Sequence, residues 1–316
     1  MSDAFDRVQT HPPSPAPRGW ARQGWRRLWL VRALLVMALL SLHLLALPAA
    51  TAAANLNPGL DQAPSAAGST AKPFHGEAAL FERALAASRS GSFAAALPLW
   101  DQVLELAPED AAAWSNRGNV RLALGDAEGA IADQGRAMTL DPEQLDPHLN
   151  RGTAEEALGR WQDAAADYRW ILERDPQEAS ALYNLGNVNG SLGDWEAARE
   201  CFDAAALARP GFAMARSSAA LAAFQLGDLE TAERQLRSLI RRYPLFADAR
   251  AGLTALLWRR GASGEAESHW VAASGLDPRY RQPDWLLGIR RWPPEPVQAL
   301  EQFLSLDAAG PLQRTA

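Results

Sequence analysis

From residue 77 to residue 278 the chain repeats one pattern of apolar and polar positions every 34 residues. Within each period, two runs of about 12 to 14 residues carry apolar side chains three and four positions apart, which places them on one face of an α-helix. Short stretches rich in small residues separate the runs. The pattern predicts six pairs of antiparallel amphipathic helices.

Three residue types keep fixed positions in this pattern. The glycines are Gly91, Gly125, Gly159, Gly193, Gly227 and Gly261. The alanines are Ala96, Ala130, Ala164, Ala198, Ala232 and Ala266. The prolines are Pro108, Pro142, Pro176, Pro210, Pro244 and Pro278. Glycine readily takes the left-handed conformation that ends a first helix, alanine allows the two helices to cross closely, and proline cannot continue the second helix.

A further glycine marks the first helices of the central repeats, at Gly118, Gly152 and Gly186. The second helices carry aromatic side chains that we assign to the core: Phe93, Trp100, Trp161, Tyr168, Trp195, Phe202 and Trp270. One helix pair is too small to bury its apolar face alone, so neighbouring pairs must share one core.

A 34-residue helix–turn–helix unit with this spacing resembles the tetratricopeptide repeat (TPR). The clearest copy is residues 181–210, ALYNLGNVNGSLGDWEAARECFDAAALARP. The resemblance implies an all-α fold, a right-handed α-solenoid. Its six predicted repeats are residues 77–110, 111–144, 145–178, 179–212, 213–246 and 247–278.

Residues 279–316 are predicted to form a C-terminal cap and tail. Trp285, Leu286 and Ile289 are expected to begin a short apolar helix that Pro293 ends. Residues 295–306 are expected to form an amphipathic helix that covers the end of repeat six, because a repeat array needs a cap for solubility.

Residues 1–54 have the composition of an export signal. A stretch with several arginines precedes an apolar run from Ala33 to Leu47, and small residues follow it up to Ala54. We therefore predict a secretory signal peptide; an uncleaved membrane anchor over residues 28–47 is the alternative. Residues 55–76 have no periodicity and are predicted to be a flexible linker.

The charge of the chain argues against a nucleic-acid partner. Residues 1–54 hold six of the 31 basic and two of the 37 acidic residues, so the rest carries 25 basic and 35 acidic residues. The acidic excess lies in residues 55–210, while residues 211–316 hold 13 basic and 11 acidic residues.

No catalytic arrangement is recognisable in the sequence. His148 and His269 belong to different repeats, and Cys201 is the single cysteine, so we predict no metal site, no cofactor and no enzymatic activity. The adjacent carboxylates Glu155 and Glu156 are interpreted as solvated charges on an exposed helix.

The candidate binding residues lie on the first helices, which are expected to line the concave face. We call them the asparagine row: Asn116, Asn119, Asn150, Thr153, Asn184 and Asn187, with Tyr183 beside them. An amide offers both a donor and an acceptor, which suits the backbone of an extended peptide. The alternative is that these amides only tie neighbouring helices together.

TPR domains that bind an acidic chaperone C-terminus place lysine and arginine beside such asparagines. The corresponding positions here are Ala112, Ser115, Asp146, Leu149, Ser180, Tyr183 and Ser217. The cations are missing, so we do not expect that kind of partner.

The tail from Asp284 to Pro294, DWLLGIRRWPP, resembles a group of thylakoid-lumen TPR proteins of cyanobacteria and chloroplasts. This resemblance implies an exported scaffold that binds protein or an extended peptide segment, and that assembles or maintains a membrane complex, a photosynthetic one in the thylakoid lumen. The alternative is a periplasmic or envelope TPR protein in outer-membrane, pilus or polysaccharide assembly. A membrane is expected to be contacted only through the signal or the client complex. The sequence does not determine the oligomeric state.

Overall fold

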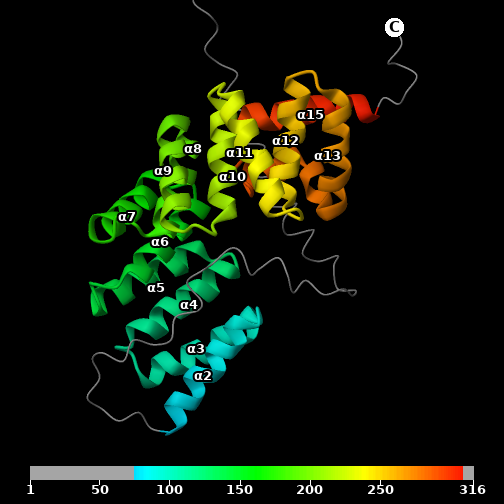
Figure 1. Cartoon of the computed structure of the whole chain (residues 1–316). Coiled ribbons are helices and arrows are strands. Elements are labelled where there is room, and N and C mark those ends of the chain that lie inside the picture. Colours follow the sequence, from blue (N-terminus) through cyan, green and yellow to red (C-terminus); the bar gives the residue numbers. More distant parts are fainter. Residues whose placement is uncertain (1–74, 309–316) are drawn as a thin grey trace, which may run out of the picture. The chain divides into compact units, whose positions relative to one another are not determined.

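The computed structural model describes residues 75–308. Its helices follow one another in pairs, and this range contains no strand. The predicted signal and nearly all of the predicted linker lie outside the described residues. Figure 1 shows the pairs succeeding one another from α2, in cyan, to α13, in orange.

The six predicted repeats each contain two helices. The first helices are α2 (His75–Arg89), α4 (Ala111–Ala123), α6 (Leu145–Ala157), α8 (Ala179–Leu192), α10 (Ala213–Gln225) and α12 (Ala247–Arg259). The second helices are α3 (Phe93–Leu106), α5 (Ala127–Leu140), α7 (Trp161–Arg174), α9 (Trp195–Ala208), α11 (Leu229–Arg242) and α13 (Ser263–Leu276). A 3₁₀ turn, η3 (Pro278–Arg281), and the helices α14 (Pro283–Gly288) and α15 (Pro294–Ala308) complete the described chain.

The turn within each repeat is made as the sequence predicts. All six glycines of the register have positive φ angles, for example 89° at Gly125. Beside it, the Gly125 N–H donates to the Leu122 carbonyl and the Asp126 N–H donates to the Arg121 carbonyl, each over 2.9 Å. The Asp126 side chain then accepts from the Gly129 N–H and begins α5. These bonds satisfy helix-end groups that would otherwise lack partners.

The small residues mark close contacts between helices, also as predicted. The six register alanines are at most 1% exposed. A Cβ atom added at Gly152 would lie 2.6 Å from the Tyr168 ring, and one added at Gly186 would lie 2.6 Å from the Phe202 ring. Real atoms do not approach so closely, so each glycine is required by the aromatic ring that faces it.

The core lies between the helices of successive repeats. One position of the second helices is buried in every repeat, and its occupants are Trp100, Gln134, Tyr168, Phe202, Leu236 and Trp270. Apolar clusters join α2 to α4, α6 to α8, and α10 to the C-terminal helices. Because every pair packs on the next, the described chain is an all-α solenoid.

Helix α15 packs against the first helices α12 and α10. The Phe303 ring lies 5.9 Å from the Trp258 ring and 6.0 Å from the Trp270 ring, measured between centroids. The helix thus covers part of repeat six, as expected, and also reaches back to repeat five. Ile289 was expected within the short apolar helix, but α14 ends at Gly288 and Ile289 is 63% exposed.

Candidate functional site

All seven predicted binding residues lie on the first helices of the three central repeats. Asn116 and Asn119 belong to α4, Asn150 and Thr153 to α6, and the other three to α8. Helix α6 contacts both α4 and α8, so the three helices form one continuous surface. The seven side chains differ, however, in whether their polar atoms already make hydrogen bonds within the protein.

Two members of the asparagine row are already bound within the protein. The Asn119 Oδ1 accepts a hydrogen bond of 3.1 Å from Gln134 Nε2. Asn150 is buried, and its Nδ2 donates over 3.4 Å to the Ser115 hydroxyl of the preceding repeat. For these two amides the structure favours the alternative that they tie neighbouring helices together.

Two other members bond to their own helix. The Asn116 Nδ2 donates to the Ala112 carbonyl and the Thr153 hydroxyl donates to the Leu149 carbonyl, each over 2.9 Å. Thr153 is exposed. Each side-chain oxygen retains acceptor capacity, so both residues remain available to a donor from a partner.

The remaining members lie on α8. Asn184 and Asn187 are partly exposed, and in residues 75–308 neither amide makes a hydrogen bond. Tyr183 differs, because its ring packs 5.5 Å from the Phe202 ring and 5.0 Å from the Phe212 ring. Tyr183 therefore belongs largely to the core, whereas the two amides are free polar groups in the described chain.

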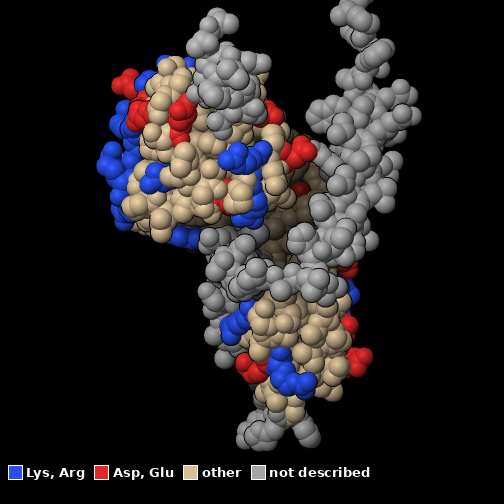
Figure 2. Space-filling model, turned by 90° about the vertical axis from the view of Figure 1, so that its right-hand side faces the viewer, with Lys and Arg blue, Asp and Glu red and all other residues tan. Residues whose placement is uncertain are grey.

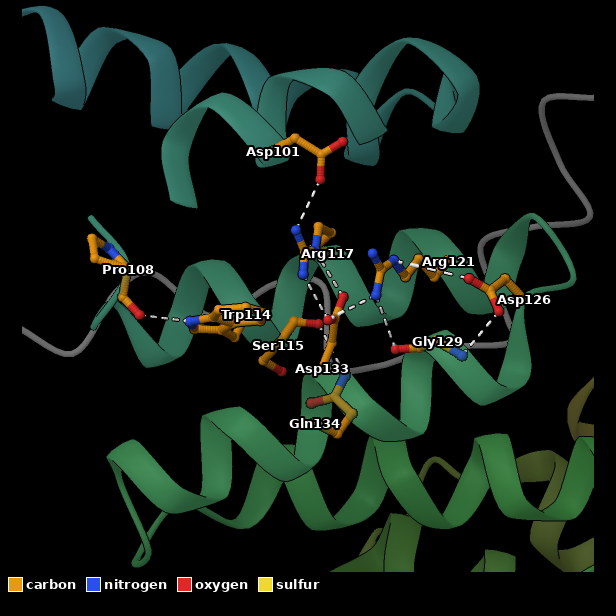
Figure 3. A network of polar contacts seen from close by, with 10 residues as sticks. All are labelled: Asp101, Pro108, Trp114, Ser115, Arg117, Arg121, Asp126, Gly129, Asp133 and Gln134. Carbon is orange, nitrogen blue, oxygen red and sulfur yellow. Dashed lines mark hydrogen bonds and ion pairs between the residues drawn. The ribbon is translucent and has the colours of Figure 1, made fainter. Parts of the chain in front are cut away.

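An ion-pair network that the sequence did not predict lies beside this surface. Figure 3 shows the Arg117 guanidinium between Asp101 of α3 and Asp133 of α5. Arg117 donates to Asp101 over 2.9 Å and to Asp133 over 2.8 and 2.9 Å, and Arg121 adds a bond of 2.9 Å to Asp133. The network joins repeats one and two.

The same pair recurs 34 residues later as Arg151 and Asp167. His148 Nδ1 also lies 2.8 Å from the Asp167 carboxylate, and the His148 ring stacks on Trp170. Burial alone would raise the pKa of Asp167, but the bonds from His148 and Arg151 outweigh it and lower that pKa. The 34-residue spacing of both arginines and both aspartates was the signal in the sequence that could have revealed this motif.

The interpretation of Glu155 and Glu156 as solvated charges is wrong. Both are 7% exposed. Glu155 pairs with Arg160 over 3.4 Å, while Glu156 accepts from the Tyr168 hydroxyl over 2.5 Å and pairs with Arg291. The sequence pattern of α6 did not indicate that these carboxylates are buried, because Arg291, which contacts Glu156, comes from a distant part of the chain.

The C-terminal segment, residues 278–294, is held by a buried carboxylate of α12. Asp248 is 1% exposed and accepts from Ser217 (2.6 Å), Tyr280 (2.8 Å), Trp292 (3.0 Å) and Arg290 (2.6 Å). Burial would raise the pKa of Asp248, yet these donors lower it, first of all Arg290. The segment is therefore fixed on the first helices of repeats five and six.

The surface has no feature of a metal centre in the described range. No group of three or more His, Cys, Asp and Glu side chains there could hold a metal ion. Cys201 is partly buried, and burial raises the pKa of its thiol. Among residues 75–308 we also find no helix with the length and apolarity needed to cross a membrane.

Basic side chains gather on the upper part of the molecule in Figure 2, at the height of the last repeats in Figure 1. Several arginines of the last two repeats have carboxylate partners. Arg237 pairs with Glu233 and Glu265, and Arg260 also pairs with Glu233. This pairing reduces the charge that an acidic partner would meet.

Comparison with known families agrees with the geometry. The family model described as tetratricopeptide repeat matches residues 81–144, 149–211, 190–236 and 217–280, which together are more than half of the chain. A search of the curated proteins found no match.

Several solved structures are similar to this chain. A tetratricopeptide repeat protein from Parabacteroides merdae is 17% identical with a TM-score of 0.53, over 72% of this chain and 98% of that one. The APC/C hetero-tetramer Cut9-Hcn1 is 16% identical with a TM-score of 0.59, over 73% and 43%. YrrB, a TPR protein with an unusual peptide-binding site, is 20% identical with a TM-score of 0.46, over 57% and 92%. At these identities the likeness to the first two structures concerns the fold alone.

Proposed function

This chain belongs to the tetratricopeptide-repeat family, a scaffold for protein or peptide binding, and from that premise we propose that the first-helix surface of α4, α6 and α8 binds an extended segment of a client protein. The family that matches is a repeat scaffold, and no catalytic family is indicated. The binding residues of this proposal are Asn184 and Asn187, supported by Asn116 and Thr153.

The observation that carries the proposal is the state of the α8 amides. Asn184 and Asn187 lie one helical turn apart on a partly exposed face, and within the described chain they have no hydrogen-bond partner. A side-chain amide in this position can donate to a carbonyl and accept from an N–H of a peptide backbone. Asn119 and Asn150 contribute differently, because their bonds fix the position of the helices.

Site-specific crosslinking tests this assignment. A photo-crosslinking amino acid at position 187 should attach to the client, whereas the same amino acid at position 139, on the exposed side of α5, should not. The double variant N184A/N187A should weaken client binding about tenfold, since one or two lost interface hydrogen bonds correspond to roughly 1.4 kcal/mol.

The matched control is N189A on the same helix, whose Nδ2 faces the Cys201 sulfur at 3.6 Å. It should bind the client as the unchanged protein does. Equal affinity of N184A/N187A and the unchanged protein, with both folded, would refute the role of α8.

We also propose that the protein is exported and that its client is a subunit of a membrane complex during assembly or repair. The composition of residues 1–54 and the likeness of residues 284–294 to thylakoid-lumen TPR proteins support this. A photosynthetic complex is the client under this proposal. Protease protection of membrane fractions and N-terminal sequencing test it: a protected protein that begins near residue 55 is expected, and an accessible one beginning at Met1 would contradict it. Recovery from the periplasm would instead favour envelope assembly.

A further inference from the structure

Three side chains of repeat three surround one arginine of the C-terminal segment. Glu156, near the end of α6, has a side chain 6% exposed. The Tyr168 hydroxyl donates to its Oε1 over 2.5 Å, and Arg291 Nη1 binds its Oε2. The Arg291 guanidinium carbon lies 5.3 Å from the centroid of the Trp161 ring. We call Glu156, Tyr168 and Trp161 the guanidinium pocket.

The pocket has the chemistry that suits arginine. A carboxylate pairs with the charge, and the face of an indole ring attracts a planar cation. The Tyr168 hydroxyl occupies the other carboxylate oxygen and so fixes the direction of the free one. Lysine fits less well because its ammonium is compact, strongly hydrated and does not stack as a plane.

Arg291 is held in this pocket less firmly than Arg290 and Trp292 are held at Asp248. Arg290 and Trp292 both donate to the buried Asp248, whereas Arg291 points to repeat three. The Arg291 side chain keeps 24% of its surface exposed. Its φ angle of 54° is the one positive value at a non-glycine residue in the described range, a conformation that costs energy for a residue with a Cβ atom.

An empty pocket would be unfavourable. Without a cation, Glu156 would be a buried carboxylate with one neutral donor, and such a group must take up a proton or find another positive partner. The pocket therefore needs an occupant, and nothing in its three side chains requires that occupant to be Arg291.

The pocket is also continuous with the proposed peptide surface. Glu156 lies three residues after Thr153 on α6, so the two side chains share one face of that helix. Helix α6 contacts α8, which carries the free asparagine amides. A peptide backbone on α8 thus lies on a helix that contacts the helix of Glu156.

We propose that the guanidinium pocket binds an arginine side chain of the client segment, and that Arg291 is its internal competitor. This inference rests on the proposed function and names the chemical class of its ligand: an extended segment that carries an arginine. When an arginine side chain of the client enters the pocket, it displaces the Arg291 side chain. Arg290 and Trp292 keep the rest of the C-terminal segment on Asp248.

The variant R291G tests this, because glycine accepts the positive φ angle while the whole side chain, including its guanidinium, is removed. The full chain is titrated calorimetrically with the peptide acetyl-Gly-Gly-Arg-Gly-Gly-amide and with its citrulline counterpart, which is isosteric and uncharged. R291G should bind the arginine peptide at least tenfold more tightly than the unchanged protein and should not bind the citrulline peptide. The double variant E156Q/R291G should lose this gain in affinity for the arginine peptide.

The matched control is R281G, which removes another arginine that lies over an indole ring, that of Trp270 at 5.1 Å. It should bind the arginine peptide as the unchanged protein does. If R291G does not fold, R291N replaces it, because asparagine tolerates a positive φ angle better than most residues, and it should show the same gain in affinity for the arginine peptide.

Equal binding of the arginine and citrulline peptides, or no gain in affinity in R291G, would overturn the proposal that the pocket binds an arginine of the client. Loss of client affinity in N184A/N187A without any arginine preference would overturn the pocket alone. An arginine preference with unchanged client affinity in N184A/N187A would overturn the asparagine surface alone.

Discussion

Asp248 and Arg290 lie 42 positions apart in the sequence and form an ion pair of 2.6 Å whose carboxylate is fully buried. Three further donors meet the same carboxylate, among them Tyr280 and Trp292. The pair thus joins the last repeat to the segment that follows it. It also positions Arg291, since that residue lies between two others that are fixed on Asp248.

Replacing Asp248 by asparagine should destabilise the protein by about 3–5 kcal/mol, because Arg290 would be left as a buried charge without a counter-ion. Urea denaturation followed by tryptophan fluorescence measures this, since Trp292 leaves a buried site when the segment detaches. The control D203N removes an exposed partner of Arg199 at 3.8 Å and should cost less than about 1 kcal/mol. Similar losses in the two variants would contradict the role given to Asp248.

Glu156 should make stability depend on pH in a defined direction. Burial raises its pKa above the ordinary value of 4.5, in spite of the opposing effect of Arg291. Its contribution to the free energy of unfolding is therefore full below pH 4.5 and is lost as the pH rises through the raised value. Urea denaturation between pH 4.5 and pH 8 should show E156Q gaining stability relative to the unchanged protein as the pH rises. A difference that stays constant over this range would disprove the assignment.

Gly186 should not tolerate a methyl group. The variant G186A places a Cβ atom against the Phe202 ring at 2.6 Å and should cost about 1–3 kcal/mol by overpacking. The control G135A lies within α5, where a Cβ atom meets nothing within 4 Å, and should stabilise the helix by up to about 1 kcal/mol. Thermal unfolding of both variants measures the difference, and effects of the same sign would rule out the packing argument.

Cys201 should react slowly with thiol reagents. Burial raises the pKa of its thiol above the ordinary value of 9.0, so little thiolate is present near neutral pH. Ellman's reagent at pH 8 should modify the folded protein at least tenfold more slowly than the protein in 6 M urea. Equal rates would show that the thiol is freely accessible.

The sequence by itself determined the repeat and its turns. The left-handed glycines, the buried alanines and the glycines that face aromatic rings depend on contacts within one 34-residue unit, and such contacts leave a regular trace in the sequence. The buried pairs of Arg117 with Asp133 and of Arg151 with Asp167 left the same kind of trace.

Only the tertiary structure decided which polar groups are free. Asn150 and Asn184 occupy equivalent positions of α6 and α8, yet the Ser115 hydroxyl of the preceding repeat binds the first and no described residue binds the second. Glu156 is buried because Arg291 reaches it from 135 positions away. Contacts over such distances follow no period, so they depend on how the stacked helices bring the C-terminal segment back to earlier repeats.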